Sequence, residues 1–178
     1  MTRQPLPACL PAALSYLERG WSALPLCPAD HAGVPAEHAR HCRSPGKGPL
    51  GPWKIYQQGR AVPDALCRSW TRNAGANVGI VLGRVSGLVG IDIDGPEGEE
   101  LLREVSGGNV PATLEFDTPG GGRRLLYRLP ESGVEVPTRS LKRGTGELKV
   151  LGEGSLTVMP PSRHANGGVY EWTGPKPG

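Results

Sequence analysis

The chain has 178 residues, with 27 glycines, 19 prolines and an aromatic content of only 5%. This length suits one domain with at most a small appendage, and the many glycines and prolines predict short strands separated by turns. The net charge of +3 is compatible with a polyanionic partner but too small to require one. The sequence shows neither a membrane-spanning segment nor a signal-peptide core, so we expect no membrane association and a cytoplasmic protein.

The first predicted element is a helix over residues 8–19, where leucines recur at helical spacing before Gly20. Residues 21–26 predict a short strand that follows directly. Because Pro25 removes a backbone hydrogen-bond donor, this strand suits the edge of a sheet.

Hydrophobic periodicity is lost over residues 27–50, and a set of metal-ligand residue types takes its place: Cys27, His31, His38 and Cys42. Two thiolates and two imidazoles with the spacing C-x3-H-x6-H-x3-C can close a tetrahedral Zn²⁺ site. Four protein ligands leave no position for water, which predicts a structural zinc instead of a catalytic one. His41 is an alternative to His38, and a loop without metal is the alternative to the zinc site.

The segment 44–49 reads Ser-Pro-Gly-Lys-Gly-Pro and contains a Gly-Lys pair, but it is not a phosphate-binding P-loop. That motif requires glycine where His41 stands and serine or threonine where Gly48 stands. A P-loop ATPase is therefore excluded. Lys47 has two readings, as a phosphate contact or as an unpaired surface charge.

The middle of the chain alternates helices and strands. Residues 63–72 predict a helix, residues 77–83 and 89–95 predict two strands that pair as a hairpin, and Pro96 opens a second helix with acidic residues in its first turns. The strand over 89–95 is the one on which we expect the site to be built.

Asp92 and Asp94 alternate with apolar residues in that strand, so both carboxylates point to one face. Two neighbouring anions repel each other unless water or a cation neutralises them, and Mg²⁺ or Mn²⁺ is the natural partner. A solvated strand end is the alternative. Side chains on separate surfaces, or an ion pair that already occupies this space, would contradict the metal site and any reaction that depends on it.

Residues 113–117 and 125–129 predict two strands joined by a glycine-rich loop that contains Gly120, Gly121, Gly122, Arg123 and Arg124. Consecutive glycines let the backbone aim several N–H groups at one anion, which predicts a phosphate-binding loop. A plain hairpin turn is the alternative. Short strands with glycine turns follow over residues 146–172, including a hairpin signal at Asn166-Gly167.

In this order, several short segments resemble the N-terminal domain of the primase–polymerase (Prim-Pol) family of the archaeo-eukaryotic primase superfamily. They are Asn77–Ile80, Ile91–Asp94, Thr118–Arg123, and Gly152–Gly154 leading into Met159–His164 with Tyr170–Trp172. The segment from residue 27 to residue 49 also resembles a zinc-binding insertion found in some members. None of these segments is specific alone, but the combination is.

The resemblance implies an α+β fold: an RRM-like mixed or antiparallel sheet with packed helices, and a small α/β unit that carries the amino-terminal part. The domain would cover residues 1–172, with the zinc-binding insertion at 27–50 and a linker-like tail at 173–178. The implied reaction is template-directed nucleotidyl transfer in the replication of a plasmid, phage or mobile element. The implied partners are nucleoside triphosphates, single-stranded DNA and a helicase.

The resemblance also assigns roles to residues. Asp92 and Asp94 would hold Mg²⁺ or Mn²⁺, and the glycine loop with Arg123 and Arg124 would hold the triphosphate. Further contacts to nucleotide or template would come from Asn77, Ser162, Arg163 and His164.

Two departures from the family pattern bear on activity. Arg124 stands where the family has a histidine, and Lys149 stands where it has an acidic metal ligand. Glu147 lies two residues before Lys149 on the same strand face and is the expected substitute ligand, with Glu153 as another candidate. If only Lys149 faces the two aspartates, the better interpretation is a nucleotide-binding or single-stranded-DNA-binding module without turnover. A purely structural zinc adaptor would leave Asp92 and Asp94 unexplained.

Overall fold

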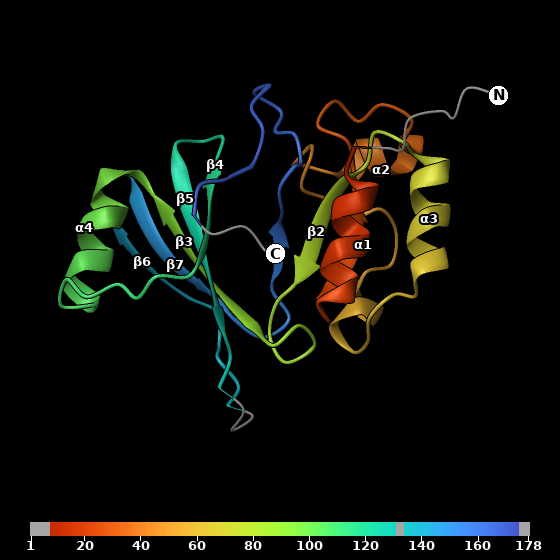
Figure 1. The fold of residues 1–178 in the computed structure, drawn as a ribbon. Helices are drawn as coiled ribbons and strands as arrows, with labels where there is room; N and C mark the ends of the chain where they lie inside the picture. The colour runs from red at the N-terminus through yellow and green to blue at the C-terminus, as the bar shows by residue number, and fades with distance from the viewer. Residues whose placement is uncertain (1–7, 131–133, 175–178) are drawn as a thin grey trace.

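The computed structural model describes residues 8–130 and 134–174 and shows an α+β fold with two antiparallel sheets (Figure 1). Helices α1 and α3 lie on the three-stranded sheet, and helix α4 covers the far face of the six-stranded sheet. Of the predicted tail at 173–178, residues 175–178 lie outside the described residues. In the described ranges, each helix is too short or too polar to cross a membrane.

The three-stranded sheet carries the amino-terminal part of the chain. Its strand order is β1-β2-β8, with bounds β1 (Ser22–Leu26), β2 (Asn77–Val81) and β8 (Leu156–Val158). Its helices are α1 (Leu10–Glu18) and α3 (Pro63–Arg72). Leu66 and Trp70 are one helical turn apart in α3, and both are fully buried. The predicted edge position of the strand that contains Pro25 is confirmed.

The six-stranded sheet has the order β6-β7-β3-β5-β4-β9. Its strands are β3 (Leu88–Asp94), β4 (Leu114–Thr118), β5 (Gly122–Arg128), β6 (Arg139–Arg143), β7 (Gly146–Leu151) and β9 (Glu171–Trp172). Helix α4 (Gly95–Val105) starts directly after β3, and Pro96 occupies its first turn, where a missing backbone N–H costs nothing. The segment between β1 and α3 contains α2 (Ala36–His41) and the short 3-10 helix η1 (Lys54–Gln57).

The predicted hairpin between residues 77–83 and 89–95 is wrong. Strand β2 has β1 on one side and β8 on the other, so both of its edges are occupied, and β3 pairs with β5 and β7 in the other sheet. A single bridge from Gly83 to Leu88 closes the turn between them. The Ser86 hydroxyl, which accepts the Ser22 N–H at 2.8 Å, fixes that turn against β1.

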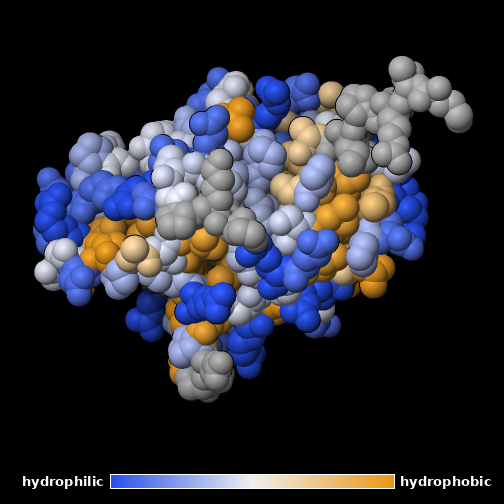
Figure 2. All heavy atoms as spheres, viewed as in Figure 1, coloured by the Kyte–Doolittle hydropathy of each residue, from blue (hydrophilic) through white to orange (hydrophobic). Residues whose placement is uncertain are grey.

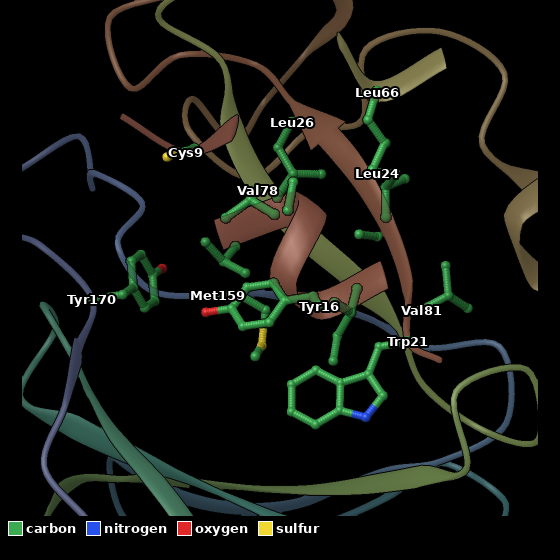
Figure 3. Close-up of a cluster of buried hydrophobic side chains, with 14 of the residues drawn as sticks. Cys9, Tyr16, Trp21, Leu24, Leu26, Leu66, Val78, Val81, Met159 and Tyr170 are labelled. Carbon is green, nitrogen blue, oxygen red and sulfur yellow. The ribbon is translucent and has the colours of Figure 1, made fainter. Parts of the chain in front are cut away.

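One hydrophobic core joins the two sheets (Figure 3). Tyr16 and Trp21 stack with ring centroids 5.4 Å apart, and Met159 and Tyr170 from the last part of the chain lie in the same cluster. Residues of the six-stranded sheet, such as Leu126, belong to this cluster as well. The core therefore fixes how the two sheets face each other.

A second, smaller core lies between α4 and the six-stranded sheet, formed by Ile93, Leu101, Leu102, Leu125 and Leu148. Ile91 packs against it, so the apolar side of β3 faces α4, and its other side turns toward the three-stranded sheet. Figure 2 shows hydrophobic surface over α1, and at the end of the molecule that carries α4 it shows a smaller hydrophobic patch among hydrophilic residues.

Candidate functional site

Two rows of side chains cross the face of the six-stranded sheet that turns toward β2, because residues directly opposite each other in antiparallel strands share a face. The first row is Phe116, Arg124, Asp92, Lys149 and Ser140, and its three middle residues alternate in charge. The second row places two carboxylates side by side: Thr118, Gly122, Asp94, Glu147 and Lys142. Asp92 and Asp94 thus share one face, as their alternation predicts.

Asp92 is held in an ion pair with Arg124 from β5. The Arg124 Nε donates to Asp92 Oδ1 at 3.0 Å, and a second guanidinium nitrogen donates to the same oxygen. The side chains of Arg124 and Asp92 are only 11% and 16% exposed, so water screens this pair weakly. This is the kind of ion pair that would contradict the predicted metal site, and it occupies the space beside Asp92 in the free protein.

Asp94 has a different environment. Burial and the neighbouring Asp92 charge raise its pKa, Glu147 adds to this increase, and Arg124 and Lys47 oppose it. Asp94 reaches this position because Gly122 has no side chain: a Cβ there would lie 2.5 Å from Asp94 Oδ1. Asp94 and Glu147 are adjacent carboxylates that repel each other, and Gly122 leaves room for the Asp94 side chain. Such a pair of oxygen donors suits a hard divalent cation.

Of the three other charged residues considered for the site, Lys149 and Glu147 lie beside the two aspartates and Glu153 does not. Lys149 lies directly opposite Asp92, on the side away from Arg124, so Asp92 stands between two cations. Glu147 lies directly opposite Asp94 on the same face. Glu153 faces elsewhere, since its carboxylate accepts the Arg84 backbone N–H at 3.0 Å and lies 3.6 Å from the Arg84 guanidinium.

The glycine loop is a tight β-turn. The Gly121 N–H donates to the Thr118 carbonyl at 3.0 Å, and Gly121 has a φ of 87°, a left-handed conformation that favours glycine. Gly120 and Gly121 border open space, whereas Gly122 is packed against β3. The turn therefore matches the hairpin interpretation in its hydrogen bonding, and it also supplies the space that Asp94 occupies.

Arg123 points away from the two aspartates, toward α4. Its Nε and one terminal nitrogen donate to the two carboxylate oxygens of Glu99 at 2.6 and 2.9 Å, and its other terminal nitrogen donates to Glu115 at 2.9 Å. Consecutive strand residues point to opposite faces, so Arg123 and Arg124 lie on opposite sides of the six-stranded sheet. The structure places Arg124, and not Arg123, beside Asp92.

Asn77 and Ser162 have internal partners. Asn77 Nδ2 donates to the carbonyls of Gly46 and Arg163 at 2.9 and 2.7 Å, and its Oδ1 accepts the Arg163 N–H. The Ser162 hydroxyl is fully buried and exchanges two hydrogen bonds with the Val78 backbone. These two side chains hold the segment after β8 against β2, and their polar atoms are hydrogen-bonded to backbone groups in this arrangement.

Arg163 and His164 lie at the edge of a surface cavity. The Arg163 side chain is exposed, and His164 Nδ1 accepts the Asn166 N–H at 3.2 Å. A cavity of about 350 Å³ is lined by both of them and by Asn77 and Pro28. The hairpin predicted at Asn166-Gly167 is present only as a turn with a single antiparallel bridge, between Arg163 and Val169, and the Gly167 N–H donates to the His164 carbonyl at 2.9 Å.

Three residues near Arg124 have no role predicted from the sequence: Thr157, Phe116 and Tyr170. Arg124 donates to the Thr157 hydroxyl at 2.5 Å, and its guanidinium carbon lies 5.8 Å from the centre of the Phe116 ring. Burial raises the pKa of Tyr170, and its ring centre lies 6.4 Å from that of Phe116. The local patterns assign none of these residues to the surroundings of Arg124, because each comes from a strand or segment distant in sequence.

The predicted zinc ligands do converge. The ligand atoms of Cys27, His31, His38 and Cys42 all lie within 4.8 Å of one another, and the two sulfurs are 3.9 Å apart. Tetrahedral Zn–S bonds of about 2.3 Å would place two sulfurs roughly 3.8 Å apart. Nε2 of His31 and of His38 is buried and finds no hydrogen-bond partner among the described residues. This cluster fits a structural zinc site.

The surroundings of the cluster support the same assignment. A Cβ at Gly48 would lie 2.6 Å from the Cys42 sulfur, so only glycine lets the loop close over the ligands. The alternative ligand His41 instead lies with its Nδ1 2.9 Å from the Glu37 carbonyl oxygen. A cavity of about 750 Å³ lies beside the cluster, between α2 and α3, away from the acidic face.

Comparison with protein-family models gives a match over most of the chain. A family model described as "Bifunctional DNA primase/polymerase, N-terminal" matches residues 13–177, which is nearly the whole chain. A search of curated proteins finds no match.

Proposed function

The chain belongs to the bifunctional DNA primase/polymerase N-terminal (Prim-Pol) family, and from this premise we propose that it catalyses metal-dependent, template-directed nucleotidyl transfer. The substrates would be nucleoside triphosphates and a primer or initiating nucleotide on single-stranded DNA. The observation that carries the proposal is the position of Glu147, directly opposite Asp94 on the face that also holds Asp92. It supports Glu147 as the acid that compensates for Lys149.

In this proposal Asp94 and Glu147 supply carboxylate oxygens for the divalent cation, and Asp92 joins them when Arg124 moves. Bound divalent cations in such sites polarise the attacking hydroxyl and stabilise the leaving pyrophosphate. Gly122 leaves room for the Asp94 carboxylate. Arg124 can grip a phosphate with two parallel hydrogen bonds, and Lys47 adds a positive charge near Asp94. Arg123 has no part in this site.

The test is primer extension with labelled nucleotides in Mg²⁺ or Mn²⁺. We expect Asp94→Asn and Glu147→Gln each to lower kcat at least 100-fold, because each removes a charged oxygen ligand. Glu153→Gln is the matched control, since Glu153 contacts Arg84 instead, and it should stay within about twofold of wild type. Normal extension by Glu147→Gln would overturn the assignment.

The second candidate is a nucleotide-binding or single-stranded-DNA-binding module of the same fold that has lost turnover. The Asp92–Arg124 ion pair and the position of Lys149 favour it, because two cations flank the first aspartate. The Lys149→Asp variant separates the candidates. A wild-type protein that binds nucleotide but extends no primer, and gains extension in Lys149→Asp, would establish the binding module.

We further propose, on the family alone, that the domain serves replication of a plasmid, phage or mobile element with a helicase in cis or in trans. The six-stranded sheet with α4 would correspond to the RRM-like sheet of that family, and the three-stranded sheet with α1 and α3 to its small α/β unit. Arg163 and His164, at the edge of a surface cavity, would contact nucleotide or template.

A further inference from the structure

Arg124 is held by partners from three different strands. Its guanidinium donates to Asp92 on β3 and to the Thr157 hydroxyl on β8, and it lies over the Phe116 ring on β4. With 11% of its side chain exposed, it has lost most of its contact with water. Such a cation is costly to leave without an anionic partner.

The same contacts make Asp92 a poor metal ligand in the free protein. Both hydrogen bonds from Arg124 go to one Asp92 oxygen, and Lys149 flanks Asp92 on the neighbouring strand. A divalent cation that approached Asp92 would meet two positive charges within the same row. Arg124 would have to leave, and it could do so readily only toward another anion.

We propose that Arg124 is an exchangeable counter-ion, which neutralises Asp92 in the free protein and moves to the triphosphate when a nucleotide binds, releasing Asp92 for a divalent cation. This inference rests on the proposed function, since it takes a triphosphate as the incoming anion. Arg124 lies two residues beyond Gly122, at the end of the hairpin where Asp94 also lies. The planar guanidinium fork suits a phosphate as well as a carboxylate.

Exchange of this kind makes the two ligands interdependent. The metal and Arg124 compete for Asp92, and Asp92 and the phosphates compete for Arg124. Removal of Arg124 must therefore strengthen metal binding, and removal of Asp92 must strengthen triphosphate binding. A permanent structural ion pair makes the opposite prediction: removal of either partner would lower stability and strengthen nothing.

The test uses two binding measurements on the full chain and does not depend on turnover. Mn²⁺ binding without nucleotide is followed by electron paramagnetic resonance, and inorganic triphosphate binding in excess EDTA by calorimetry. We expect Arg124→Gln to raise Mn²⁺ affinity about tenfold and to lower triphosphate affinity about tenfold. We expect Asp92→Asn to raise triphosphate affinity about tenfold, because Arg124 is then free.

Arg143→Gln is the control. It removes a guanidinium from the same sheet, whose partners Glu100 and Glu104 lie on α4, so both affinities should stay at their wild-type values. Circular dichroism and thermal melting of each variant establish that it is folded. Should Asp92→Asn and Arg124→Gln, both folded, strengthen neither binding event, the counter-ion exchange is wrong.

The binding measurements can fail or succeed independently of the proposed reaction. If the wild-type chain fails to extend a primer yet shows both affinity increases, nucleotidyl transfer is wrong and the exchange stands as a binding property. If extension is normal and neither increase is seen, the exchange is wrong and the proposed reaction stands.

Discussion

Replacement of Gly122 by alanine is the sharpest test of how the glycine turn and the acidic strand fit together. A Cβ at this position would lie 2.5 Å from Asp94 Oδ1 and 2.5 Å from the Ile93 carbonyl oxygen. The Asp94 side chain could rotate away, but the Ile93 carbonyl belongs to β3, which is hydrogen-bonded between β5 and β7. The backbone of β3 or β5 must therefore shift.

Overpacking of this kind costs about 1–3 kcal/mol. For a chain of this size, 1 kcal/mol lowers the melting temperature by roughly 2–4 °C, so Gly122→Ala should melt about 2–12 °C below wild type. Because Asp94 is displaced as well, the Mn²⁺ affinity of the Gly122→Ala variant should fall. Differential scanning calorimetry and electron paramagnetic resonance measure the two effects.

Gly120→Ala is the control from the same turn. No atom lies within 4 Å of a Cβ at Gly120, so this substitution should change stability by no more than about 0.5 kcal/mol. If Gly122→Ala has the melting temperature of wild type, or if Gly120→Ala is destabilised as much as Gly122→Ala, the proposed contact between the turn and the acidic strand is refuted.

Three further predictions concern other parts of the molecule. Cys42→Ser should lose the zinc, about one ion per chain by metal analysis, and melt at a lower temperature, whereas His41→Ala should keep it; purified wild type without zinc would contradict the assignment. The hydrogen bond from Arg123 lowers the pKa of Glu99, so this pair stabilises the fold above the ordinary carboxyl range and ceases to do so as the pH falls below it. The melting temperature of Glu99→Gln should lie below that of wild type at neutral pH, and the difference should shrink as the pH falls through and below the ordinary carboxyl range. Trp70→Ala should lower the free energy of unfolding by about 3–5 kcal/mol in urea titrations, because Trp70 is fully buried.

The sequence by itself determined the features that depend on near neighbours in the chain. Helical spacing of leucines predicted α1, and alternation in β3 put Asp92 and Asp94 on one face. The Cys and His spacing predicted the zinc ligands, because all four fall within a short segment that can fold back on itself. The position of Glu147 on the strand face beside Lys149 followed from the same alternation.

Only the tertiary structure decided which strands pair and which charges meet. The partners of β2 come from segments about 55 and 77 residues away, and the bond between Arg124 and Asp92 spans 32 residues. Alternation shows that Arg123 and Arg124 point to opposite faces, but not which of them meets the aspartates. That choice follows from the register between β5 and β3, which is set by packing against α4 on one side and the other sheet on the other. Contacts of this kind depend on distant segments, and local residue patterns carry no information about them.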